Sequence, residues 1–239
     1  MKKKFLSVVF CLLFGLFANA ENLNYVVTDL NMNNFWQQIG KSQEKAQKVS
    51  EKLILSNKIN KRVPVFVVSQ QNSANATTNK ITRVIEIHSG LLYCIDNDDE
   101  LAFVIAHEMA HALETYNGPL SIFVNTTFNA KSYEMKSDLK AIDLMVKAGY
   151  DPISGMIILN KISPEPLSDW GFFSAHPKGS KRLLEMYKYI YKKYPQYLAS
   201  DKTLNPYFRN FEYIYAEELQ GFRHKEEVRK QKQIERGAL

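Results

Sequence analysis

The chain has 239 residues, of which 45% are hydrophobic and 23% are charged. This length suits one domain with its own core, or one domain with a small addition. Half of the formal net charge of +6 comes from Lys2, Lys3 and Lys4. The remaining sequence is therefore only mildly basic, and we expect no nucleic acid partner.

The first twenty residues have the pattern of a secretory signal peptide. A basic start is followed by an apolar run over residues 5–17 and by the triplet Ala18-Asn19-Ala20, which has the small-x-small form of a cleavage site. The apolar run is shorter than the roughly 20 residues of a membrane-spanning helix, so an uncleaved anchor is the less favoured interpretation. We expect cleavage after Ala20 and export, most simply to a bacterial periplasm.

The next segment predicts one helix and two strands. Apolar residues recur at helical spacing from Asn33 to about Asn60. Residues 62–69 (RVPVFVVS) and 80–88 (KITRVIEIH) are rich in β-branched residues and predict strands, separated by a polar turn. We expect the two strands to pair as a hairpin. An edge strand beside a catalytic helix can pair with an extended peptide.

Residues 98–116 (DDELAFVIAHEMAHALETY) contain an H-E-x-x-H sequence within an apolar helical run. His107 and His111 are four residues apart, so they lie on one face of a helix. Two neutral imidazoles in this position can bind one zinc ion, and Glu108 can act as a general base toward a water molecule there. The alternative is an ordinary core helix with two hydrogen-bonded histidines.

A catalytic zinc ion needs a third protein ligand. Glu114 shares the helical face but lies roughly 10 Å from His107 along the axis, and the metzincin arrangement is excluded because position 117 is Asn117. The next helix offers Glu134 and Asp138, which share a face. We predict that Glu134 is the third ligand and that Asp138 accepts a hydrogen bond from the far nitrogen of His107. The alternative is an acidic pair on a solvated helix.

The rest of the chain is predicted to be mainly helical. Residues 122–149 form a helix that ends at Gly149, residues 178–193 form an amphipathic helix, and residues 206–235 form the last helix. Together the elements predict an α+β fold. It is mostly helical, with a small antiparallel sheet beside the H-E-x-x-H helix.

Three stretches, DDELAFVIAHEMAH, YEMKSDLKAIDLMVKAGYDP and SAHPKGSKRL, carry a resemblance that spans residues 80–185. They resemble the CAAX prenyl protease and HtpX-like family of gluzincin zinc metallopeptidases. Because the membrane-spanning segments of those branches are absent, the chain resembles the small soluble exported branch. The resemblance implies the same zinc ligands, base and supporting carboxylate that the spacing predicts, namely His107, His111, Glu134, Glu108 and Asp138.

The resemblance adds two candidate catalytic residues. The family's H-P-x-x-x-x-R element matches His176, Pro177 and Arg182. It implies that His176 faces the cleft, where it stabilises the oxyanion or occupies the open zinc position in a latent state. Arg182 would support the ligands or the substrate. The alternative for His176 is a surface histidine beside a helix that starts at Pro177.

We therefore expect a signal peptide (1–20), a zinc metallopeptidase domain (21–195) and a helical C-terminal extension (196–239). The expected activity is that of an exported metalloendopeptidase with one zinc ion, acting on polypeptides such as misfolded envelope proteins. The alternative is a periplasmic chaperone or assembly factor with a zinc site and little turnover, although a structural zinc site needs no base such as Glu108.

Basic residues gather near the C-terminus, between Arg223 and Arg236. We interpret this segment as the solvated face of a helix. The second interpretation is peripheral association with the envelope, because a basic helix attracts anionic lipids and polymers.

Overall fold

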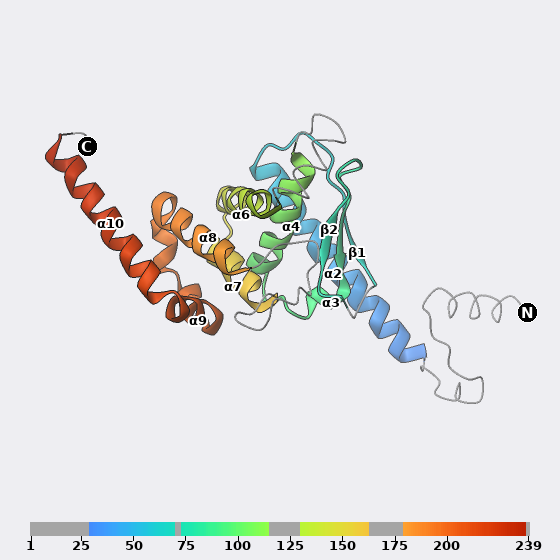
Figure 1. The fold of residues 1–239 in the computed structure, drawn as a ribbon. Coiled ribbons are helices and arrows are strands. Elements are labelled where there is room, and N and C mark those ends of the chain that lie inside the picture. Colours follow the sequence, from blue (N-terminus) through green and yellow to red (C-terminus); the bar gives the residue numbers. More distant parts are fainter. Residues whose placement is uncertain (1–28, 70–72, 115–129, 163–178, 238–239) are drawn as a thin grey trace, which may run out of the picture. The chain divides into compact units, whose positions relative to one another are not determined.

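The computed structural model of the protein describes residues 29–69, 73–114, 130–162 and 179–237. The chain forms two compact units, residues 1–41 and residues 42–239. The first helix of the described ranges, α2 (Asp29–Ser56), contains the boundary between them. All contacts described below lie within the second unit, in which helices and a small sheet confirm the predicted α+β class (Figure 1).

The sheet has three strands in the order β1-β3-β2 (Figure 1). β1 (Val65–Val68) pairs in parallel with the central β3 (Ile85–His88), whereas β2 (Ala76–Thr78) pairs antiparallel to β3. The sheet is therefore mixed, and the prediction of an antiparallel sheet with a hairpin between residues 62–69 and 80–88 is wrong. The hairpin joins β2 to β3, and β2 lies within the segment that was expected to be a polar turn.

The turn after β2 explains this difference. Oδ1 of Asn79 accepts hydrogen bonds from the backbone N–H groups of Ile81 and Thr82, both at 3.0 Å, which is the Asx-turn chemistry that reverses a chain. Arg83 completes the turn with a φ of 60°. The first half of the expected second strand is therefore a turn, and only its second half is extended.

The helix with the H-E-x-x-H sequence, α4 (Asp98–Leu113), lies at the centre of the core. Every residue from Glu100 to Ala112 is buried, because α4 packs against α6 (Ala130–Lys147), α7 (Ile153–Ile162) and β2. The short helix α3 (Ser89–Leu92) links the sheet to this region. The histidines of α4 are thus held on a rigid element from which bulk water is excluded.

The end of α6 confirms the predicted role of Gly149. This residue has a φ of 70°, which glycine adopts without strain. The backbone N–H of Tyr150 bonds to the carbonyl of Met145 at 3.0 Å, and that of Gly149 bonds to Val146 at 3.1 Å. These two bonds form a Schellman motif, which ends α6 and directs the chain into α7.

The C-terminal part contains more elements than expected. After α8 (Gly179–Lys193) come two 3-10 helices, η2 (Pro195–Ala199) and η3 (Asp201–Leu204). The single helix predicted over residues 206–235 is two helices, α9 (Pro206–Ile214) and α10 (Ala216–Glu235).

The two helices on either side of Tyr215 differ in how many of their side chains are buried. α9 buries Phe208 and Phe211, whereas α10 buries only Leu219. Phe208 and Phe211 therefore pack on the core, and most of α10 is solvated. Within the described ranges, no helix is both long enough and apolar enough to cross a membrane.

Candidate metal centre

Three predicted ligands from two helices meet at one point. The Nε2 atoms of His107 and His111 are 3.1 Å apart. Oε2 of Glu134 lies 3.2 Å from Nε2 of His107, and Oε1 lies 3.3 Å from Nε2 of His111. All three side chains are buried, and one ligand atom from each lies within 4.8 Å of the others.

This arrangement fits a zinc ion. Atoms that each lie roughly 2.0–2.1 Å from a tetrahedral ion are about 3.3 Å apart, close to the spacings between His107, His111 and Glu134. Two imidazoles and a carboxylate form the ligand set of a catalytic zinc site, in which the fourth position takes water or substrate. The residues therefore suit a zinc ion with one exchangeable position.

The outer nitrogens of both histidines also have partners. Nδ1 of His107 lies 2.9 Å from Oδ1 of Asp138, the carboxylate that we expect to accept its hydrogen bond. Nδ1 of His111 lies 3.1 Å from Oγ of Ser137, a contact that we did not predict. Partners of this kind fix the tautomer and the orientation of a metal-binding imidazole. α6 thus supplies one candidate ligand and a neighbouring polar group for each histidine.

Arg182 of α8 lies against this cluster. Its Nε and Nη2 atoms each donate a 2.7 Å hydrogen bond to Asp138, and Nη1 lies 3.6 Å from Oε2 of Glu134. Arg182 and Asp138 are only 5% and 1% exposed. The resemblance implied that Arg182 supports either the ligands or the substrate. Its contacts with Glu134 and Asp138 correspond to the first of these roles.

The acidic side chains around His107 control the charge of the site. Burial alone would lower the pKa of His107, but hydrogen bonds with Asp138 and Glu134 raise it to about 10. Burial would raise the pKa of Asp138, yet Arg182 and His107 hold it below its ordinary value. Burial lowers the pKa of His111 and so favours its neutral form. The carboxylates beside His107 therefore favour positive charge at this position, and a metal ion also carries positive charge.

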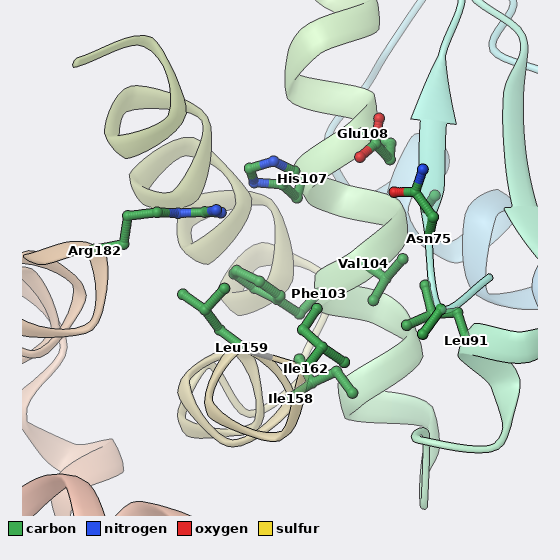
Figure 2. A pocket seen from close by; sticks show the side chains of 12 residues that line it. Asn75, Leu91, Phe103, Val104, His107, Glu108, Ile158, Leu159, Ile162 and Arg182 are labelled. Atoms are coloured by element: carbon green, nitrogen blue, oxygen red, sulfur yellow. The ribbon is translucent and has the colours of Figure 1, made fainter. Parts of the chain in front are cut away.

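An apolar pocket opens beside His107 and Glu108 (Figure 2). His107 leaves α4 on the side of Arg182, whereas Glu108 leaves it on the side of Asn75 (Figure 2). The apolar wall comes from α3, α4 and α7 and includes Leu91, Phe103, Val104, Ile158, Leu159 and Ile162. Glu108, the expected base, therefore lies at the boundary between the polar side chains of the candidate metal site and the apolar wall of the pocket.

Two further side chains near the ligands were not predicted. The ring of Tyr133 stacks on His111, with centroids 4.8 Å apart, and Nζ of Lys80 lies 4.8 Å from the centroid of Tyr133. The position of Tyr133 directly before Glu134 was the only signal in the sequence. His176, the other residue taken from the resemblance, lies outside the described residues.

Replacing Arg182 by alanine is expected to lower the free energy of unfolding by about 3–5 kcal/mol, because it leaves the buried carboxylate of Asp138 without its main cation. Urea unfolding of the metal-free protein measures this loss. The exposed neighbour Lys181 provides the control, since Lys181→Ala should change the free energy by less than about 0.5 kcal/mol. Equal losses in the two variants would show that the buried ion pair is unimportant.

The fold and the site together define a class: an α+β protein in which an H-E-x-x-H helix and a glutamate on the next helix place two imidazoles and a carboxylate where they could hold one metal ion. Residues 40–118 match the family model described as Peptidase family M48. The match covers about a third of the chain, contains His107, Glu108 and His111, and ends before Glu134. It supports a zinc metallopeptidase family. A comparison with curated proteins found no match.

Proposed function

We propose that the protein is an exported zinc metalloendopeptidase that cleaves polypeptides of the cell envelope, in the small exported branch of the CAAX prenyl protease and HtpX-like family. The observation that carries this proposal is the convergence of His107, His111 and Glu134 beside Glu108. Export is supported by the signal-type pattern of residues 1–20, which lie outside the described residues.

A zinc ion held by His107, His111 and Glu134 would supply a Lewis acid and would lower the pKa of water toward roughly 7. The carboxylate of Glu108 accepts a proton from the attacking water and later delivers it to the amine that leaves. The outer hydrogen bonds of the two histidines keep their rings oriented. This division of tasks gives Glu108 no part in holding the metal.

Two features favour an extended polypeptide as the substrate. β2 lies at an edge of the sheet and packs against α4, so a peptide can add beside it as a further strand. The apolar pocket next to His107 and Glu108 favours a substrate with an apolar side chain near the cleaved bond. We therefore propose cleavage of exposed apolar stretches, such as those of unfolded proteins.

Removal of the metal tests this function. We expect 1,10-phenanthroline to abolish cleavage of an unfolded protein by the purified mature chain, and zinc but not magnesium to restore it. A peptide with leucine beside the cleaved bond should be cleaved faster than the same peptide with aspartate. Undiminished cleavage after complete removal of metal would contradict the proposal, as would prevention of aggregation without any cleavage.

A further inference from the structure

The last residue of β2, Thr78, contacts the residue proposed as the base. Oγ1 of Thr78 donates a hydrogen bond to Oε2 of Glu108 at 2.7 Å and lies 3.0 Å from the backbone oxygen of Glu108. A hydroxyl group has a single proton to donate. The shorter contact, to the carboxylate, is the stronger one because a charged acceptor strengthens a hydrogen bond.

The backbone on both sides of this contact is fixed. Thr78 pairs with Ile85 in the antiparallel ladder between β2 and β3, and its β-branched side chain has few rotamers. Glu108 is only 4% exposed and belongs to the central helix α4. The free rotations of the glutamate side chain are therefore limited by a donor that cannot itself move far.

A hydrogen bond at one oxygen does not prevent proton transfer at a carboxylate. The two oxygens of an ionised carboxylate offer about four lone-pair sites, so the group can accept from Thr78 and still accept a proton from water. Proton transfer needs the acceptor within about 2.6–3.2 Å of the donor. A misplacement of about 1 Å can cost roughly 100-fold in rate.

We propose that Thr78 is a positioning residue that holds the carboxylate of Glu108 in the orientation required for proton transfer. The same residue ends the edge strand beside which a peptide would add, so substrate docking and base orientation depend on one short strand. This inference rests on the proposed function, because it assigns Thr78 a role in the reaction of Glu108.

The test compares three variants of the full mature chain loaded with zinc. Thr78→Val keeps the shape of the side chain but removes the hydroxyl group, and Thr78→Ser keeps the hydroxyl group. Thr203→Val is the matched control, because it also removes a hydrogen-bonded threonine hydroxyl group, one that bonds to the backbone oxygen of Ser200 at 2.7 Å in the region of η3, outside the proposed site. Steady-state kinetics on an unfolded peptide, zinc content and the thermal unfolding midpoint are measured for each.

We expect Thr78→Val to lower kcat by roughly 10–100-fold, with little change in KM and with zinc retained. Thr78→Ser should restore most of kcat, and Thr203→Val should leave it unchanged. In a crystal structure of Thr78→Val, the carboxylate of Glu108 should have moved from its place in the parent protein.

Three results would overturn the positioning role: a kcat for Thr78→Val equal to that of Thr203→Val, a loss that Thr78→Ser does not recover, or an unmoved carboxylate in the crystal. A loss of zinc from Thr78→Val would also overturn it, since the effect would then act through the metal. A parent protein that cleaves no peptide contradicts the proposed function instead, and the crystal comparison alone then decides whether Thr78 orients Glu108.

Discussion

Replacing Glu108 by glutamine is expected to abolish peptide cleavage while zinc remains bound. Glutamine has almost the same size as glutamate, but its amide cannot take a proton from water at neutral pH. Loss of a general base costs roughly 10²–10⁴-fold in rate. The hydroxyl group of Thr78, which donates to Oε2 in the parent protein, can still donate to the amide oxygen, so the side chain should keep its position. The measurement is kcat/KM on an unfolded peptide.

The zinc content of Glu108→Gln is the necessary control. It should equal that of the parent, because Glu108 is not among the three residues whose ligand atoms converge. Both proteins are purified identically. Because the variant should be inactive, any protease activity in its preparation measures the contribution of a contaminating protease. Cleavage by Glu108→Gln at the parental rate would refute the proposed mechanism, and cleavage-independent biological activity would favour the chaperone alternative.

Replacing Glu134 by alanine is expected to remove both zinc and activity. This change deletes the only carboxylate among the three converging ligands and leaves a buried cavity beside Arg182, whose Nη1 lies 3.6 Å from Oε2 of Glu134. Loss of a group that merely supports a ligand costs roughly 10–100-fold in metal affinity, so loss of the ligand itself should cost more. Metal analysis after dialysis against a weak chelator measures the effect.

Glu114 provides the matched control for this experiment. Apart from Glu108, it is the carboxylate nearest to the histidines in the sequence, at the C-terminal cap of α4, and its distance from His107 along the helix axis argues against it as a ligand. Glu114→Ala should retain zinc. Retention of zinc by Glu134→Ala together with its loss from Glu114→Ala would reverse the assignment of the third ligand.

Features set by local geometry could be predicted from the sequence. The spacing of His107 and His111 places both on one helical face, and the same rule places Glu134 and Asp138 on one face of the next helix. A glycine with positive φ at position 149 ends that helix as expected. In the first two cases helical spacing determines which side chains share a face, and in the third the backbone freedom of glycine determines where the helix ends. None of these features requires knowledge of distant contacts.

Features set by distant contacts could not be predicted in this way. β2 consists of three residues within a polar segment, so its pairing with β3 depends on the Asn79 turn and on packing against α4 rather than on its own hydrophobic pattern. Thr78 is 30 residues from Glu108, and Ser137 is 26 residues from His111. Their hydroxyl groups become recognisable as partners only when the chain is folded.

Zinc X-ray absorption spectroscopy on the purified protein tests the central claim most directly, since it reports the atoms around the metal. We expect one zinc ion per chain with two imidazole nitrogens from His107 and His111 and oxygen from Glu134, all at about 2.0–2.2 Å. Sulfur at about 2.3 Å, from the free thiol of Cys94, would contradict the assigned ligands. A protein that binds no stoichiometric zinc would contradict the claim altogether.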